Sequence, residues 1–250
     1  MILGIDIGGT SLKAALVNTS AGEIVGEIRR VPTPQPCTRE ALLDALVGIV
    51  RDFGHAGAVG VGFPGVIRNG VVATAANLGE SLIGWRLAED LRARCALPKV
   101  ALVNDADAAG LAIAAYSGNE VTPGLTVVLT LGTGIGGALV YGGKLVPNFE
   151  PARYRIRNPL AAPGEEIEAE CLLSEINRQK LNLTWEQWSA WFSDYLSEIH
   201  ATLWPEQILL GGGGAHQSKH FLHLLKAPCP VRIAHLGNDA GILGAALAAR

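Results

Sequence analysis

Two stretches of the sequence share one pattern, in which an apolar strand leads into a glycine-bearing turn and a second strand follows. Residues 2–17 carry it around Gly8-Gly9-Thr10 (the first glycine loop), and residues 125–141 carry it around Gly132-Thr133-Gly134 (the second glycine loop). One such loop alone would equally fit a plain hairpin turn, but glycine also lets backbone N–H groups approach a phosphate closely. The repeat predicts a duplicated architecture, with two similar halves and a cleft between them.

Apolar periodicity predicts that strands and helices alternate along the rest of the chain. Further strands are expected at residues 23–31, 58–63, 100–103, 207–210 and 231–234. Helices are expected after Thr38, at 87–95, 106–116 and 165–180, after a Thr184–Gln187 capping box, and at 240–249 behind an Asn238-Asp239 cap. The aromatic residues of the helix after Thr184 recur at helical spacing, which predicts a core face or a subunit interface. Residues 148–163 show no period.

Composition excludes several classes of protein. With 49% hydrophobic and 17% charged residues among 250, the chain is expected to be globular rather than disordered. Its net charge of -3 gives no overall attraction to nucleic acid or to a membrane, so neither is expected as a partner. Its four cysteines form no C-x-x-C pair, and the N-terminal residues lack a basic segment of the secretory type. We therefore expect a reduced, cytoplasmic protein.

The first glycine loop carries groups that phosphoryl transfer needs, since that reaction requires clamped negative charge, an oriented metal and a deprotonated acceptor. Gly8 and Gly9 offer backbone N–H groups, and Thr10 and Lys13 offer side chains, to hold phosphate oxygens. Asp6 ends the preceding strand. It is the candidate to orient a hydrated Mg²⁺, because that ion usually keeps waters and binds through a carboxylate and the substrate phosphates.

Three further positions complete the candidate site. Thr133 and Gly134 of the second glycine loop are expected to hold phosphate from the other side. Asp105 follows a predicted strand, at the kind of strand end where ligands collect in α/β sheets, and is the candidate general base for an attacking alcohol. A role as helix N-cap would equally explain it. A later run of glycines offers backbone access to the nucleoside end of a nucleotide. It comprises Gly211, Gly212, Gly213 and Gly214.

The motifs occur in a recognisable order: an acid-Gly-Gly-Thr-x-x-Lys start, an Asn-Asp strand end, a Leu-Gly-Thr-Gly-Ile-Gly loop and the late glycine run. This order resembles the sugar kinase, heat-shock and actin superfamily, and within it the ROK family of sugar kinases. More narrowly, several stretches are similar to the polyphosphate glucokinases of that family, and only about residues 149–183 lack the similarity. Those stretches are residues 62–66, 74–77, 104–110, 129–136, 145–148 and 203–242.

The resemblance implies an α/β fold of two actin-like (ribonuclease H-like) domains with a cleft between them. Residues 1–105 would form the N-terminal domain, with the helix at 239–250 packed back on it, and residues 106–238 the C-terminal domain. The implied reaction moves a terminal phosphate from polyphosphate and/or ATP to the 6-hydroxyl of glucose, with Mg²⁺. A homodimer is implied as well.

The resemblance also assigns roles to individual residues. Asp105 matches the catalytic base of the family. Asp6, the first glycine loop and Lys13 match its first phosphate motif, and Thr133 and Gly134 match its second. The positions implied to bind the sugar are Asn77, Asn104, Asp105 and Glu150.

Glu150 begins a stretch in which the sequence departs from the family. The Glu-x-Gly-His sugar-binding motif reads Glu150-Pro151-Ala152-Arg153, and the cysteine-rich zinc segment of many ROK kinases is absent, as it is in polyphosphate glucokinases. Arginine is longer than histidine and permanently charged, which favours an acidic or phosphorylated sugar, although an Arg153 directed to solvent fits equally well. Two alternatives to a working glucokinase therefore remain. One is a kinase of the same fold with a different acceptor, and the other is a non-catalytic sugar or phosphate sensor.

Basic residues near this stretch allow two interpretations. Arg153, Arg155 and Arg157 alternate as neighbours on one face of a strand would. Together with Arg178, Lys180 and Lys219 they could line a track for a long polyanion, or they could be ordinary solvated charge.

Overall fold

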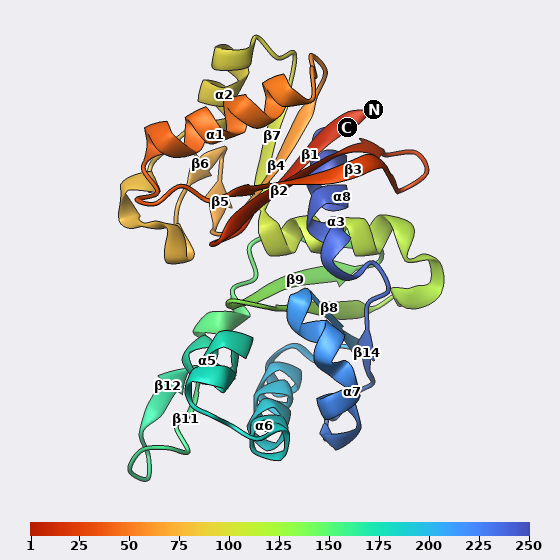
Figure 1. Ribbon diagram of the computed structural model, residues 1–250. Coiled ribbons are helices and arrows are strands. Elements are labelled where there is room, and N and C mark those ends of the chain that lie inside the picture. Colours follow the sequence, from red (N-terminus) through yellow and green to blue (C-terminus); the bar gives the residue numbers. More distant parts are fainter. The chain divides into compact units, whose positions relative to one another are not determined.

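The computed structural model describes residues 1–76, 78–118 and 120–250, and these divide into two compact units. The first unit comprises Met1–Tyr116 and Asp239–Arg250, and the second comprises Ser117–Asn238. In Figure 1 the last helix of the chain, coloured dark blue, therefore belongs with the red, orange and yellow elements. Within the described part of the chain, no helix is both long enough and apolar enough to cross a membrane.

The first unit is built on a five-stranded sheet. Its strands are β1 (Ile2–Ile7), β2 (Ser11–Asn18), β3 (Glu23–Pro32), β4 (Val59–Phe63) and β7 (Val100–Asn104), in the order β3-β2-β1-β4-β7. The pairs β1/β2 and β2/β3 are antiparallel, whereas β1/β4 and β4/β7 are parallel. A small separate hairpin pairs β5 (Ile67–Arg68) with β6 (Val71–Val72).

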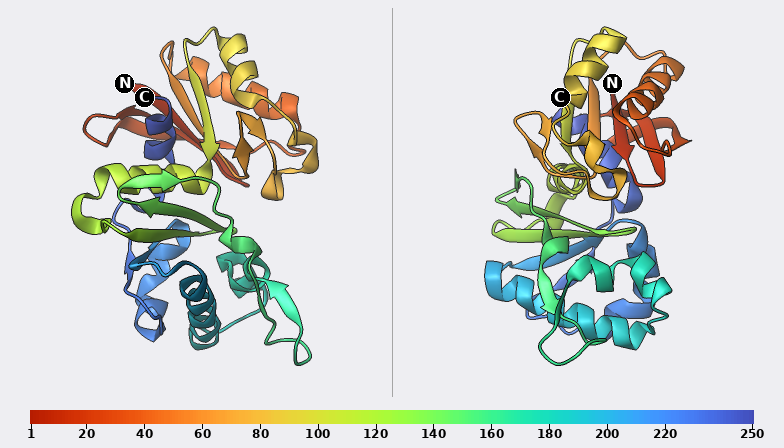
Figure 2. Two further views of the ribbon diagram at one scale, coloured as in Figure 1. Left: turned by 180° about the vertical axis from the view of Figure 1, so that it is seen from behind. Right: turned by 90° about the vertical axis from the view of Figure 1, so that its left-hand side faces the viewer.

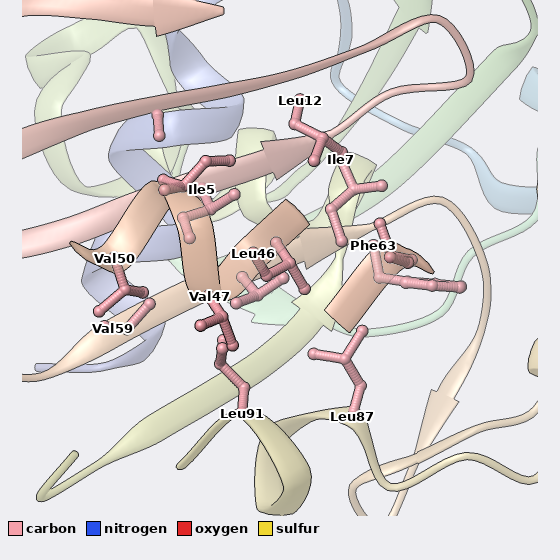
Figure 3. Close-up of a cluster of buried hydrophobic side chains, with 14 of the residues drawn as sticks. Ile5, Ile7, Leu12, Leu46, Val47, Val50, Val59, Phe63, Leu87 and Leu91 are labelled. Atoms are coloured by element: carbon pink, nitrogen blue, oxygen red, sulfur yellow. The ribbon is translucent and has the colours of Figure 1, made fainter. Parts of the chain in front are cut away.

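Helices α1 (Arg39–Asp52) and α2 (Leu87–Cys95) cover one face of this sheet. Because side chains alternate across a strand, every second residue of β1 and β4 points into this core. Figure 3 shows Ile5, Ile7, Val59 and Phe63 from the strands packed with Leu46 and its neighbours. The Thr38 hydroxyl caps α1 by accepting a hydrogen bond from Ala41 N–H, as the sequence predicted.

The intervening residues of β1 and β4 face α8 (Ala240–Ala248), which also packs on α3 (Asp105–Tyr116). A Cβ atom on Gly60 would lie 1.7 Å from the carbonyl oxygen of Ala245, and one on Gly244 would lie 1.6 Å from that of Ala108. Only glycine permits backbones to approach this closely. This contact places the unit boundary after Tyr116 rather than after residue 105, because α3 packs with α8 and the first sheet.

The second unit repeats this topology. Its strands are β8 (Leu125–Leu131), β9 (Ile135–Tyr141), β10 (Lys144–Val146), β13 (Gln207–Gly211) and β14 (Val231–Ile233), in the order β10-β9-β8-β13-β14. As in the first sheet, two antiparallel pairings are followed by two parallel ones. The duplication predicted from the two glycine loops is thereby confirmed.

The core of the second unit lies between this sheet and α6 (Trp185–Leu203), the long helix coloured teal to blue below the green strands in Figure 2. The capping box of Thr184 and Gln187 opens α6 as predicted. Trp188, Phe192 and Tyr195 are buried in the core, so the aromatic residues form a core face. The shorter helices of the unit are α4 (Ala169–Leu173), α5 (Glu175–Lys180) and α7 (Ser218–Phe221).

Two local predictions were wrong. The helix expected at 165–180 is divided, because residues 166–168 form β12 (Glu166–Glu168) and α4 and α5 follow it. Residues 148–163, in which the sequence showed no period, contain β11 (Arg155–Arg157), which pairs with β12. Three-residue strands are too short to produce a readable period. At the start of α8, Asp239 occupies the cap position but its side chain makes no capping hydrogen bond.

Candidate functional site

The first glycine loop turns β1 tightly into β2. Gly8 N–H donates to the Ser11 carbonyl at 3.0 Å, and Thr33 holds the loop from outside through its hydroxyl, which donates to the Gly8 carbonyl at 2.6 Å. Across the described residues, the N–H groups of Gly9 and Thr10 have no acceptor within the protein. Two adjacent N–H groups without a protein acceptor suit an anionic oxygen.

Asp6 and Lys13 form a cross-strand pair beside this loop. They are direct partners in the β1/β2 register, and the Lys13 Nζ lies 3.6 Å from the Asp6 Oδ2, with both side chains mostly buried. Burial raises the pKa of Asp6, and the positive charge of Lys13 opposes that rise. Gly241 leaves room for the carboxylate, since a Cβ there would lie 2.9 Å from the Asp6 Cγ.

Asp105 lies close to Asp6 in the same unit. The register pairs Asp6 with Gly62 and Phe63 with Asn104, so the ends of three neighbouring parallel strands meet here. A Cβ on Gly62 would lie 3.6 Å from the Asp105 Cα and 3.8 Å from the Asp6 Oδ1. The fold therefore brings together Asp6, the predicted Mg²⁺ partner, and Asp105, the predicted general base.

Helix α3 is capped by Asn104 rather than by Asp105. The Asn104 Oδ1 accepts the N–H of Asp107 at 2.9 Å, three residues on, which is the capping geometry. Its Nδ2 donates to the Gly65 carbonyl at 3.2 Å. Asp105 is the first residue of the helix and accepts the N–H of Ala106 at 2.8 Å. Helix capping therefore does not explain why residue 105 is an aspartate. Asn104 has a structural role as the N-cap, in addition to its predicted contact with the sugar.

The second glycine loop is held at both ends by protein contacts. Gly132 N–H donates to the Gly134 carbonyl at 3.0 Å, and the Gly132 carbonyl accepts the N–H of Glu175 at 3.2 Å. Ile135 N–H donates to the Oε2 of Glu170 at 2.9 Å. In the part of the chain that the structure describes, this leaves the N–H groups of Thr133 and Gly134 without a protein acceptor, and these are the two residues predicted to bind phosphate.

Glu150 lies in an acidic environment in the second unit. Burial raises the pKa of its carboxyl group, Arg153 opposes the rise, and the carboxylate of Glu170 adds to it. Arg153 ends a short 3-10 turn and is exposed. The Tyr195 hydroxyl of α6 donates to the Pro151 carbonyl at 3.0 Å and anchors that turn on the core.

Glu170 is the site residue that the sequence did not reveal. It touches the second glycine loop and affects Glu150, which lies twenty positions earlier in the chain. A single sequence offers no signal that separates it from the neighbouring acids of residues 165–170.

The late glycine run has a packing role. Gly212 has φ 76°, and a Cβ there would lie 2.6 Å from the Leu131 carbonyl oxygen, at the end of β8. By contrast, a Cβ on Gly211 would meet nothing within 4 Å, and one on Gly213 would come no closer than 3.6 Å to Asn238. Gly212 is therefore explained without a ligand, and the nucleotide role of Gly211, Gly212 and Gly213 stays a prediction.

The predicted strand face of basic residues forms in part, because Arg155 and Arg157 share the exposed face of β11 whereas Arg153 lies in the turn before it. Arg155 pairs with Glu166 at 3.2 Å, and Arg178 pairs with Glu175 at 3.0 Å while lying over the ring of Trp185. These contacts favour ordinary surface charge over a polyanion track. The last predicted sugar-binding residue, Asn77, lies outside the described residues.

Comparison with known proteins places this geometry in a family. The model of the ROK family matches residues 2–147, which include both glycine loops and Asp105. The chain belongs to the ROK family. The resemblance found in the sequence and the α/β, actin-like fold that it implied are thereby confirmed.

Particular members of the ROK family are similar over almost the whole chain. A polyphosphate glucokinase of Mycobacterium tuberculosis (strain CDC 1551 / Oshkosh) is 38% identical over 245 residues, covering 98% of this chain and 89% of that protein. The crystal structure of an inorganic polyphosphate/ATP-glucomannokinase from Arthrobacter sp. strain KM is 39% identical with a TM-score of 0.90, covering 98% and 96% of the two chains. A ROK glucokinase from Streptomyces griseus, solved with glucose and AMPPNP, is 25% identical with a TM-score of 0.82 and covers 100% and 99%.

Proposed function

We propose that this protein transfers the terminal phosphate of polyphosphate or ATP to the 6-hydroxyl of glucose, with Asp105 as general base. Its enzyme class, a phosphotransferase with an alcohol acceptor, is confirmed by the relatives that it matches. The observation that carries the proposal is the position of Asp105 at the meeting of three strand ends, beside Asp6, with helix capping left to Asn104.

The donor is assigned to the two glycine loops. Each offers two N–H groups that find no acceptor among the described residues, and a terminal phosphate presents several anionic oxygens. Lys13 adds a positive charge beside the first loop, which favours the charge that develops during transfer. Gly211, Gly212 and Gly213 are proposed to contact the nucleoside when the donor is ATP.

Asp6 fits the role of a magnesium partner. Among the described residues, no three His, Cys, Asp or Glu side chains gather into a metal-binding cluster. Mg²⁺ usually keeps several waters and binds through a carboxylate together with substrate phosphates, so Asp6 would hold the ion and the ion would supply positive charge to the donor phosphate. Lys13 opposes the rise in the pKa of Asp6 that burial causes, and so favours the charged carboxylate that this contact needs.

Asp105 is proposed to accept the proton of the attacking hydroxyl. Its Oδ1 is held by the N–H of Ala106, so the orientation of the carboxylate is fixed by the first turn of α3. Asn77, Asn104 and Glu150 are proposed to position the sugar. A homodimer and a cytoplasmic location remain predictions from the sequence.

The donor and acceptor assignment is tested by one coupled assay, in which polyphosphate, ATP and GTP are each combined with a panel of hexoses. Glucose 6-phosphate is the expected product, and Asp105→Asn enzyme is the control that must lose it. If every pair of substrates fails with the wild-type protein, the proposal is overturned. In that case, tight sugar binding by calorimetry would support the sensor interpretation.

The departure at Arg153 favours one second candidate, a kinase with a different acceptor. Arg153 is exposed and close enough to Glu150 to affect its pKa, so a charged side chain stands where the family has histidine. An acidic or phosphorylated hexose that outcompetes glucose in the same assay would support it. The matched variant is Arg153→His, which should then shift the preference back towards glucose. Equal preference in both proteins means that Arg153 does not select the acceptor.

A further inference from the structure

The second glycine loop lies against a carboxylate of its own protein. The Oε2 of Glu170 accepts the N–H of Ile135, the residue directly after the loop, at 2.9 Å. A Cβ on Gly134 would lie 2.1 Å from that same oxygen and 3.0 Å from the Cδ of Glu170. Apart from the two residues adjacent in the chain, the three described protein atoms nearest to that added Cβ all belong to Glu170, and the φ of Gly134 does not require glycine.

We propose that Glu170 is a positioning residue for the donor and that residue 134 is glycine in order to admit its carboxylate. Glu170 holds the Ile135 N–H and so fixes the turn that directs the N–H groups of Thr133 and Gly134 towards the donor phosphate. The inference rests on the proposed function, because it concerns the donor site of that reaction.

The placement of Glu170 is itself rigid. Its backbone carbonyl accepts the side-chain amide of Asn177 at 2.9 Å and the N–H of Ser174 at 3.2 Å. The next helix holds the other end of the loop, through the N–H of Glu175 on the Gly132 carbonyl. Glu170 and Glu175 therefore fix the two ends of the second glycine loop, at the Ile135 N–H and the Gly132 carbonyl. The N–H groups of Thr133 and Gly134 between them remain for a ligand.

The negative charge of Glu170 repels an anionic donor, so a carboxylate beside a phosphate site needs a separate explanation. Its hydrogen bond to a backbone N–H is stronger than a neutral one, which favours a single loop conformation. Glutamine has the same shape and keeps an acceptor for Ile135 without the charge. Glu170→Gln and Glu170→Ala therefore separate the hydrogen bond from the charge.

The first measurement needs no substrate. Selective ¹⁵N-isoleucine labelling, with the Ile135 signal assigned through Ile135→Val, gives the hydrogen-exchange rate of this one N–H. Exchange should be slow in the wild type and in Glu170→Gln, and at least about tenfold faster in Glu170→Ala and Gly134→Ala. Unchanged exchange in Glu170→Ala overturns the proposal, whatever reaction the protein catalyses.

The second measurement is a double-mutant cycle on donor KM at saturating acceptor. Gly134→Ala alone should raise donor KM about tenfold, because the new Cβ displaces Glu170. In a Glu170→Ala background, the same substitution should add less than about twofold, since the carboxylate is already gone. An undiminished penalty in that background means that residue 134 is glycine because of the ligand, and overturns the proposal.

Glu170→Gln should keep donor KM within about twofold of the wild type, and a rise as large as that of Glu170→Ala also overturns the proposal.

Two controls complete the cycle. Cys171→Ala changes the exposed neighbour of Glu170 on α4 and should match the wild type in both measurements. Gly9→Ala, in the first glycine loop, should have the same effect with and without Glu170. If the wild type proves inactive with every donor, tripolyphosphate binding by calorimetry replaces KM in the cycle, so that failure of the proposed function and failure of this inference remain distinct.

Discussion

The two glycine loops occupy equivalent places in two sheets of the same topology, yet a lysine and an aspartate lie beside the first loop and a glutamate lies beside the second. Beside the first loop, Lys13 is paired with Asp6 across the β1/β2 ladder. Beside the second, the carboxylate of Glu170 accepts the N–H of Ile135. Each loop still leaves two N–H groups for a ligand. The two halves therefore share the backbone geometry of these loops but differ in the charges beside them, and if both loops bind phosphate as proposed, the first is expected to contribute more to donor affinity.

The largest effect is expected from Asp105→Asn. This variant changes neither glycine loop, so the loop variants can be compared with it. Asparagine keeps the shape of the side chain but does not accept the proton of the acceptor hydroxyl, so kcat should fall about a thousandfold with polyphosphate and with ATP. Donor KM should change little, because the residue belongs to neither loop. Steady-state kinetics with both donors measures this, and retention of a tenth of the wild-type kcat contradicts the role of general base.

Lys13→Met tests the cation of the first loop. Methionine keeps the length of the side chain without its charge, so donor KM should rise by about tenfold to a hundredfold. Donor KM of the wild type should also depend more steeply on salt than that of the variant, because the lost interaction is electrostatic. The matched control is Lys144→Met, which removes an exposed lysine of β10 and should leave donor KM unchanged. A similar rise in both variants would mean that only overall charge matters.

The same substitution in the two loops sharpens the comparison further. Apart from its chain neighbours, no atom of the described residues would lie within 4 Å of a Cβ on Gly9, so Gly9→Ala should leave Tm unchanged to within about 1 °C. Any rise in donor KM, expected at about threefold, then reports contact with the ligand alone. Thermal unfolding and donor titration of Gly9→Ala and Gly134→Ala in parallel test this, and a drop in Tm for Gly9→Ala contradicts the open geometry of the first loop.

The smallest effect is expected on stability, from Glu150→Gln. Burial and Glu170 raise the pKa of Glu150 in the folded protein above its ordinary value near 4.5, so the folded state binds this proton more tightly than the unfolded state. The stability that this group contributes is present below its unfolded pKa and is lost as pH rises through the raised folded pKa. Glutamine is neutral throughout, so the variant should gain about 2 °C in Tm at pH 8 and less at pH 5. An equal gain at both pH values contradicts burial of the charged form.

The features that could be predicted from sequence were those encoded locally. Helix α2 lies at Leu87–Cys95 as predicted, and the caps at Thr38 and Thr184 formed because side-chain capping depends on a few consecutive residues. The paired glycine loops revealed the duplicated fold because each encodes one strand, one turn and one strand.

What escaped prediction depends on contacts between distant segments or on a shift of one residue. Glu170 acquires its position only because α4 packs against a loop that lies 35 residues earlier. The hairpin of β11 and β12 has strands too short to carry a period. The N-cap of α3 fell on Asn104 rather than Asp105 because the helix begins one residue earlier than predicted.

The close packing of α8 has a consequence for how the protein is made. The first sheet is covered on one face by residues 239–250, where Gly4 and Gly60 meet the backbone of Ile242 and Ala245. Synthesis proceeds from the N-terminus, and domains generally fold as units. The whole of the second unit, a continuous segment from Ser117 to Asn238, is therefore synthesised before the helix that completes the first unit. The half of the protein that is translated first is the half whose last element is made last.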